Sequence, residues 1–135
     1  MQLEVLAGNQ PAQPLPFPVT ATRHGTWILD PVTLLVALGE ELARGVTVRD
    51  LAARFHDSVA AAAADLAARL AADAGVGTVA MGGGCFQNGR LLSSLTDRLE
   101  THGLRVLAPR ELSPNDGAIS YGQAAVAASC LQGES

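Results

Sequence analysis

The stretch that decides the fold is residues 76–108, which read VGTVAMGGGCFQNGRLLSSLTDRLETHGLRVLA. Apolar runs at 77–81 and 104–108 predict two β-strands, and residues 88–102 between them carry leucines at helical spacing. A further helix is expected over 116–131. This order predicts an α/β fold in which a helix crosses back over two parallel strands, so that the loops following both strands share one edge of the sheet.

Three consecutive glycines, Gly82, Gly83 and Gly84, follow the first predicted strand. Glycine lets a chain turn its N–H groups toward a ligand, and the helix that begins near Asn88 is expected to offer unpaired N–H groups and a positive dipole end. Gln87 and Asn88 add side-chain hydrogen-bonding groups. The loop therefore points to a nucleotide or acyl phosphate, while a tight turn without a ligand, with Asn88 as an ordinary cap, has roughly equal weight.

The loop after the second predicted strand includes Ser-Pro-Asn-Asp-Gly-Ala at 113–118 and has a similar design. Asp116 is a candidate metal ligand, with Asn115 beside it, because hard cations prefer oxygen ligands. Asp is also a common cap, and a cap ahead of a helix over 118–131 requires no metal. From this loop alone the cap is the favoured interpretation, and the metal ligand is the alternative.

The chain is expected to form one domain, residues 1–135, with three segments. Residues 1–30 carry prolines at 11, 14, 16 and 18, which predict a mostly extended lead-in. Residues 31–75 are expected to be helical, and residues 76–131 to form the α/β core with the nucleotide site. A short strand or packed turn is expected over 27–29.

Local signals mark the ends of the helices in the middle segment. Asp30 followed by Pro31 is a helix cap with proline at the first helical position. Thr47 with Asp50 resembles a capping box, and Gly75 is expected to end the second helix. Alanines along that helix predict a face that packs closely against another element.

Composition excludes several functional classes. The 135 residues carry a net charge of −4, which argues against a nucleic-acid binder or a protein of anionic membrane surfaces. The chain has no lysine and therefore no Walker motif, and Gly75 and Gly77 precede their strand, whereas a dinucleotide fingerprint follows one. Two cysteines form no disulfide framework, and no signal peptide or membrane span is evident, so a cytoplasmic location is expected.

Cysteine, histidine and arginine side chains are further candidates for chemistry. Cys85 at a helix start is a candidate nucleophile, but a small buried residue is the favoured interpretation. The three histidines lack metal-ligand spacing, and His56 is interpreted as a core or surface residue. Arg90 and Arg110 are candidates to balance phosphate charge, although solvated arginines are commoner.

Two motifs resemble those of the hydrogenase maturation carbamoyltransferase HypF family. Residues 81–88 resemble its Ser-Gly-Gly-x-Phe-x-Asn motif, and residues 113–123 resemble its Pro-Pro-Asn-Asp-Gly-Gly-x-x-x-Gly-Gln motif. Their order and separation also fit, and the similarity extends to residues 51–57, 27–31 and 3–7. The resemblance therefore covers almost the whole chain.

The resemblance implies the carboxyl-terminal lobe of a two-lobed ATPase fold of the actin, sugar-kinase and Hsp70 (ASKHA) type. In such proteins carbamoyl phosphate and ATP give carbamoyladenylate, which is used to carbamoylate the carboxyl-terminal cysteine of HypE in [NiFe]-hydrogenase maturation. The implied partners are a complementary amino-terminal lobe, or a full HypF-like chain, and a HypE-like acceptor.

The same resemblance assigns roles by motif. Gly83 and Gly84 are expected to contact nucleotide phosphate, Asn88 to anchor the nucleotide, and Asp116 to coordinate a divalent metal, iron or zinc, whose other ligands belong to the first lobe. Supporting roles are expected for Gly82, Gln87, Asn115 and Gly117. Gly82 replaces the family's serine, and Ala118 replaces a glycine of the later motif.

Three functional interpretations follow. Nucleotide in this fold lies between two lobes, so a carbamoyltransferase lobe is expected to show weak or no activity alone. The second interpretation is a noncatalytic partner-binding or oligomerisation module that keeps the fold, for example as a homodimer. The third is a lobe of an antibiotic O-carbamoyltransferase.

Overall fold

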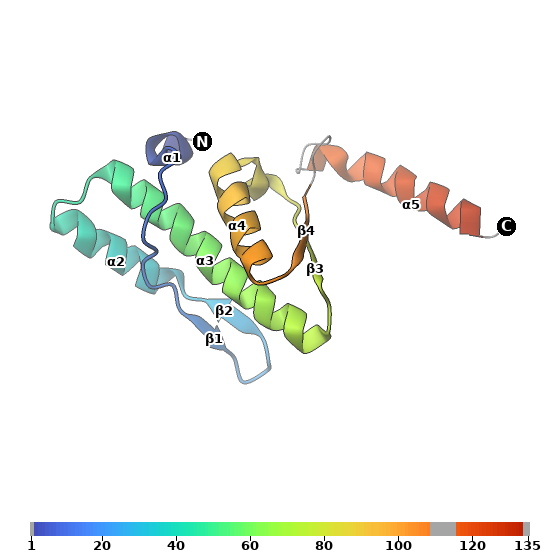
Figure 1. Ribbon diagram of the computed structural model, residues 1–135, viewed down its shortest axis with the longest axis horizontal. Helices are drawn as coiled ribbons and strands as arrows, with labels where there is room; N and C mark the ends of the chain where they lie inside the picture. The colour runs from blue at the N-terminus through green and yellow to red at the C-terminus, as the bar shows by residue number, and fades with distance from the viewer. Residues whose placement is uncertain (1, 109–115, 134–135) are drawn as a thin grey trace.

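The computed structural model of the chain describes residues 2–108 and 116–133. Its elements are, in chain order, α1 (Gln2–Ala7), β1 (Val19–Ala21), β2 (Trp27–Leu29), α2 (Pro31–Ala43), α3 (Val48–Ala74), β3 (Thr78–Ala80), the 3₁₀ turn η1 (Gly84–Gln87), α4 (Gly89–Thr101), β4 (Arg105–Leu107), the 3₁₀ turn η2 (Asp116–Ala118) and α5 (Ile119–Gly133). In Figure 1, α2 and the β1–β2 hairpin lie along one side of α3, and α4 with β3 and β4 along the other.

The long helix α3 is the axis on which the other elements pack. Four of its six buried alanines belong to two hydrophobic clusters. Ala52 and Ala53 pack against Ala7 of α1, and Ala60 and Ala64 pack in one cluster with Met81, Leu95 and Leu99. Alanine side chains are short, so neighbouring helices approach α3 closely, and burying a leucine such as Leu99 contributes about 2 kcal/mol. The expected close-packing face is confirmed.

The predicted α/β core is confirmed. Strands β3 and β4 pair in parallel, with Val79 opposite Val106, and α4 connects them. The pairing extends one residue past β3, because the Met81 N–H donates to the Leu107 carbonyl at 2.8 Å. The loop of Gly82, Gly83 and Gly84, called the glycine loop below, therefore begins directly at the carboxyl end of β3.

The predicted helix ends are also confirmed. The Asp30 carboxylate accepts the Val32 N–H at the start of α2, and the Thr47 hydroxyl accepts the Asp50 N–H at the start of α3. Helix α3 ends at Gly75, which has φ 65°, a left-handed conformation that glycine adopts without strain.

The lead-in contains a short helix, α1, that the sequence pattern did not predict. It forms because Ala7 buries its methyl group against α3. The β1–β2 hairpin follows, antiparallel, with Thr20 opposite Ile28. Between α1 and the hairpin the chain is extended along α3. There the Ala12 N–H donates to Asp57 and the Leu15 N–H donates to Ser58. Side chains of α3 therefore satisfy two of the backbone donors that remain between the prolines.

Helix α5 follows the second loop and extends away from the rest of the chain (Figure 1). Its apolar side chains are exposed, among them Ile119, Tyr121, Val126 and Leu131. Within residues 2–108 and 116–133, no helix combines the length and the apolar character that crossing a bilayer requires.

Candidate functional site

The glycine loop is an exposed backbone turn. Gly83 has φ 108° and ψ 160°, a combination that essentially only glycine adopts, and its carbonyl accepts the Phe86 N–H at 3.1 Å to close the turn η1. A Cβ built on Gly82, Gly83 or Gly84 would meet no atom within 4 Å. The surface above the loop is therefore open to a ligand.

The backbone donors of this loop are available. In the described part of the chain, no hydrogen bond engages the N–H groups of Gly82, Gly83 and Gly84. Exposed backbone N–H groups without a partner can donate to phosphate oxygens. The residues present therefore fit a nucleotide phosphate at this loop.

The amino terminus of α4 differs from the sequence-based expectation of unpaired donors. The carboxylate of Glu4, from α1, accepts the Gly89 N–H at 2.7 Å and the Arg90 N–H at 3.3 Å. The Leu91 N–H donates to the Asn88 side-chain oxygen, at 2.9 Å. That expectation was wrong because a carboxylate 85 positions earlier in the sequence occupies the helix end. The donors open to a ligand belong to the glycines, not to the helix.

Asn88 joins the glycine loop to α4 and uses both ends of its amide. Its Oδ1 caps the helix through Leu91, and its Nδ2 lies 2.8 Å from Nε2 of His56. One amide N–H is left for a ligand, because the group has two. The expected role of Asn88 as nucleotide anchor stays a prediction.

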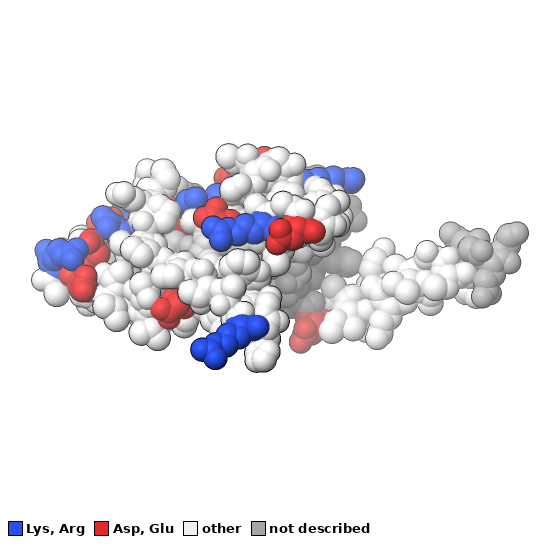
Figure 2. Space-filling view, turned by 90° about the horizontal axis from the view of Figure 1, so that it is seen from below, with Lys and Arg blue, Asp and Glu red and all other residues white. Residues whose placement is uncertain are grey.

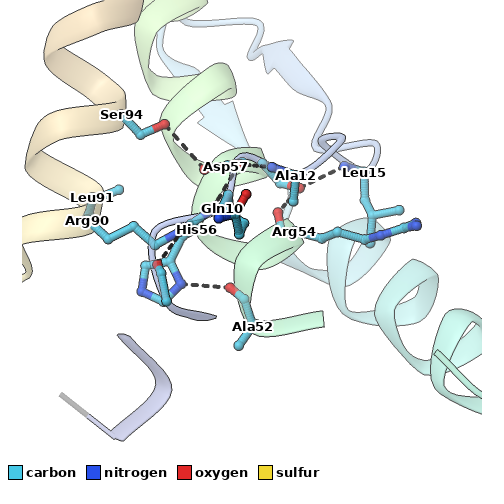
Figure 3. A network of polar contacts seen from close by, with 12 residues as sticks. Gln10, Ala12, Leu15, Ala52, Arg54, His56, Asp57, Arg90, Leu91 and Ser94 are labelled. Atoms are coloured by element: carbon cyan, nitrogen blue, oxygen red, sulfur yellow. Dashed lines mark hydrogen bonds and ion pairs between the residues drawn. The ribbon is translucent and has the colours of Figure 1, made fainter. Parts of the chain in front are cut away.

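Beside this joint, Asp57 of α3 and Arg90 of α4 form a buried ion pair at 3.1 Å (Figure 3). Arg90 also donates to the carbonyls of Gly8 and Gln10, and Ser94 donates to Asp57. The interpretation of Arg90 as a solvated arginine was wrong, since its side chain is only 8% exposed. Its ion pair with Asp57 neutralises its charge within the fold, and a role in balancing phosphate charge stays a prediction.

The network of polar contacts around Asp57 was not predicted from the sequence. Asp57 and Arg90 are 33 positions apart, and no local pattern links them. The available signal was the presence of His56 and Asp57 within the 51–57 segment that carries the family resemblance. His56, interpreted as a core or surface histidine, is in the core, with 3% exposure.

Two other predicted site residues lie in the turn η1, and two follow β4 in the sequence. Gln87 is exposed at the end of η1. Cys85 is also exposed, so its interpretation as a buried residue was wrong; Phe86 is the residue of that turn that packs on the core. Asn115 and Arg110 lie outside the described residues.

Asp116 opens the turn η2 ahead of α5 and is exposed, with Gly117 following it. Among residues 2–108 and 116–133, no group of three or more His, Cys, Asp or Glu side chains is placed to hold a metal ion. A single exposed carboxylate does not make a metal site. The described residues alone therefore do not fit a bound metal.

The glycine loop does not line the main hollow of the surface. A hollow of about 510 Å³ opens between the lead-in and α4, lined by Asn9, Asp57, Arg90 and Ser94 among others, but the glycines of the loop do not line it. On the face in Figure 2, acidic and basic side chains lie next to one another without a basic patch. The loop itself lies on open surface.

Comparison with protein families identifies a similarity that covers most of the chain. Residues 1–123 match the family model described as "Carbamoyltransferase, Kae1-like Domain, second subdomain". The match includes the glycine loop, His56, Asp57 and Asp116.

Individual proteins show the same similarity. The chain is 45% identical over 94 residues to the carbamoyltransferase HypF homolog of Cupriavidus necator, covering 70% of this chain and 24% of that protein. It is 42% identical over 88 residues to carbamoyltransferase HypF of Synechocystis sp., covering 61% and 11%. The crystal structure of full-length HypF in the phosphate- and nucleotide-bound form superposes with a TM-score of 0.84 at 29% identity, over 96% of this chain and 17% of that one. The chain spans a quarter or less of the length of these relatives.

Proposed function

Because this chain belongs to the HypF carbamoyltransferase family, as the second subdomain of a Kae1-like domain, we propose that it supplies half of a nucleotide-dependent carbamoyl-transfer site. The supporting observation is the glycine loop. Gly83 holds a conformation restricted to glycine, and the N–H groups of Gly82 to Gly84 are exposed and have no partners among the described residues. A phosphate can approach such a backbone without steric hindrance.

Each residue has a distinct part in this proposal. Gly83 and Gly84 bind the phosphate of ATP or carbamoyladenylate through their backbone N–H groups, and Gly82 extends the donor row. Asn88 contributes its remaining amide N–H, and Gln87 is close enough in sequence to add a side-chain contact. The bound nucleotide would carry the carbamoyl group in activated form.

The proposal for a divalent metal, iron or zinc, is limited to one ligand. Asp116 follows β4 in the chain, at the start of η2, and contributes one carboxylate. The other ligands would come from a complementary amino-terminal lobe, since the described residues hold no three-ligand cluster.

The proposed partners follow from the open surface of the glycine loop and from the small share of its relatives' length that the chain spans. Phosphate bound to an open loop is exposed to water, and a second lobe would complete the contacts and exclude water. We therefore propose that the chain acts with the remainder of a HypF-like protein. The proposed acceptor is the carboxyl-terminal cysteine of a HypE-like protein, in [NiFe]-hydrogenase maturation in the cytoplasm.

The test is reconstituted transfer. The chain is mixed with the remaining part of a HypF-like protein, HypE, ATP and labelled carbamoyl phosphate, and HypE is analysed by mass spectrometry. Label on the HypE cysteine is expected only when the chain is present, and Gly83→Ala should abolish it. Transfer that is unchanged by omission of the chain would contradict the proposal.

A noncatalytic interaction module is the second candidate, and two observations favour it. Glu4 occupies the helix end where an anion was expected, and α5 exposes apolar side chains such as Val126 and Leu131. Sedimentation analysis tests this alternative: it predicts a concentration-dependent dimer or complex that forms without nucleotide and is lost in Val126→Asp.

A further inference from the structure

His56 is a buried histidine whose two ring nitrogens both have partners. Nδ1 lies 2.7 Å from the Ala52 carbonyl oxygen, and Nε2 lies 2.8 Å from the Asn88 amide nitrogen; Figure 3 shows His56 directed toward Ala52. A carbonyl only accepts hydrogen bonds, so the carbonyl assigns the proton to Nδ1. The neutral ring then presents Nε2 as an acceptor, which matches the N–H of Asn88.

This tautomer fixes the orientation of the Asn88 amide. With Nδ2 donating to His56, Oδ1 faces Leu91 and accepts its N–H at 2.9 Å. A flipped amide would place Oδ1 against the Nε2 lone pair and the NH₂ group against the Leu91 N–H. Both contacts would be repulsive, so His56 selects the orientation in which Asn88 caps α4.

Asn88 also holds the end of the glycine turn. Its backbone N–H donates to the Cys85 carbonyl at 3.2 Å, so one residue joins η1 to α4. On α3, the neighbour of His56 is Asp57, which binds Arg90 two positions beyond Asn88. Two consecutive residues of α3 therefore fix the segment that leaves the glycine loop.

The other capped helices show that a cap does not require such support. Asp30 caps α2 and Thr47 caps α3, and in the described residues neither cap side chain contacts a histidine. Among the caps of α2, α3 and α4 in the described residues, only the one adjoining the glycine loop has a buried imidazole as partner, although burying a polar ring has a desolvation cost. Helix capping alone therefore does not account for His56, and its contact with Asn88 points to a role in the glycine loop.

We propose that His56 is a positioning residue for the nucleotide loop. His56 fixes the orientation of the Asn88 side chain. Asn88 in turn closes the end of the glycine turn and presents its remaining amide N–H to the nucleotide. This inference rests on the proposed function, because the ligand of the loop is nucleotide.

The test compares two substitutions that each keep one of the two hydrogen bonds. His56→Gln can place an oxygen near the Nε2 position and accept from Asn88, whereas His56→Asn can donate to the Ala52 carbonyl but is too short to reach Asn88. Ser58→Ala is the stability control, since it removes a buried hydroxyl of α3 that bonds Leu15 and Arg54 rather than Asn88.

Calorimetric titration with ATP gives the first readout. We expect His56→Gln and Ser58→Ala to bind within about threefold of the wild type, and His56→Asn to bind at least about tenfold more weakly, although all three lose stability. Equal affinities for Gln and Asn variants, or losses that follow stability alone, would overturn the inference.

Amide hydrogen exchange, measured without ligand, gives the second readout. Protection of the Leu91 N–H should be kept in His56→Gln and lost in His56→Asn, and ¹⁵N NMR of the wild type should show the proton on Nδ1. Protection that is the same in both variants, or a proton on Nε2, would overturn the positioning role. If the wild type binds no ATP even with the complementary part of a HypF-like protein present, the proposed function is wrong, and exchange still decides whether His56 orients Asn88.

Discussion

Asp57 and Arg90 form an ion pair, with 3.1 Å between Oδ2 and Nη2, in which the two side chains are only 7% and 8% exposed. Breaking a buried pair leaves a charge without a partner and without water. We therefore predict that Asp57→Ala lowers the free energy of unfolding by about 3–5 kcal/mol. Urea unfolding followed by circular dichroism measures the change.

The control for this prediction is an exposed pair. Glu40 pairs with Arg44, with both side chains 61% exposed, and Glu40→Ala should change the free energy of unfolding by less than about 1 kcal/mol. Similar losses of unfolding free energy in the two variants would contradict the prediction, because the buried Asp57–Arg90 pair would then contribute no more than an exposed pair.

Glu4 is predicted to stabilise α4 from a distance. Its carboxylate bonds two N–H groups at the positive end of the helix, so Glu4→Ala should lower the free energy of unfolding by about 1 kcal/mol. Sulfate should reduce the difference from the wild type, because the freed N–H groups of Gly89 and Arg90 can bind it.

A control lies at the other end of the same helix. Glu100 is near the negative end of α4, and Glu100→Ala should leave stability unchanged or raise it slightly. The assignment of Glu4 as a helix-end partner fails if sulfate stabilises wild type and Glu4→Ala equally.

Asp30 gives a pH prediction. The Thr33 hydroxyl and the Val32 N–H donate to its carboxylate and lower the pKa of Asp30. A lowered folded-state pKa means that the stabilisation is fully present above the unfolded pKa and is lost as pH falls through the folded one. Melting temperatures of wild type and Asp30→Asn, compared between neutral pH and about pH 3, should show a wild-type advantage that disappears only in acid. An advantage that does not vary with pH would contradict this.

Features set by short-range chemistry could be predicted from the sequence. Asp30, Thr47, Gly75 and Asn88 each mark a helix end through groups within a few residues, and all four were placed correctly. The order of β3, α4 and β4, and the position of the glycine loop at the strand end, followed from hydrophobic period and chain direction.

Features set by distant contacts could not be predicted. Helix α1 depends on Ala7 packing against α3, and the occupied end of α4 depends on Glu4. The burial of Arg90 depends on Asp57, on another helix. These partners are brought together only by tertiary packing, so the propensity of their own segments carries no sign of them. Residues 109–115 of the second loop, which include Asn115, lie outside the described residues.

The most direct test of the central claim is ATP titration of Gly83→Ala beside Gly103→Ala. Both glycines have positive φ, 108° and 77°, and open space at Cβ, so both substitutions strain the backbone, but only Gly83 is in the glycine loop. We predict that Gly103→Ala binds ATP as the wild type does and that Gly83→Ala binds at least about tenfold more weakly. Equal affinity of the two variants would contradict the claim that this loop binds nucleotide phosphate.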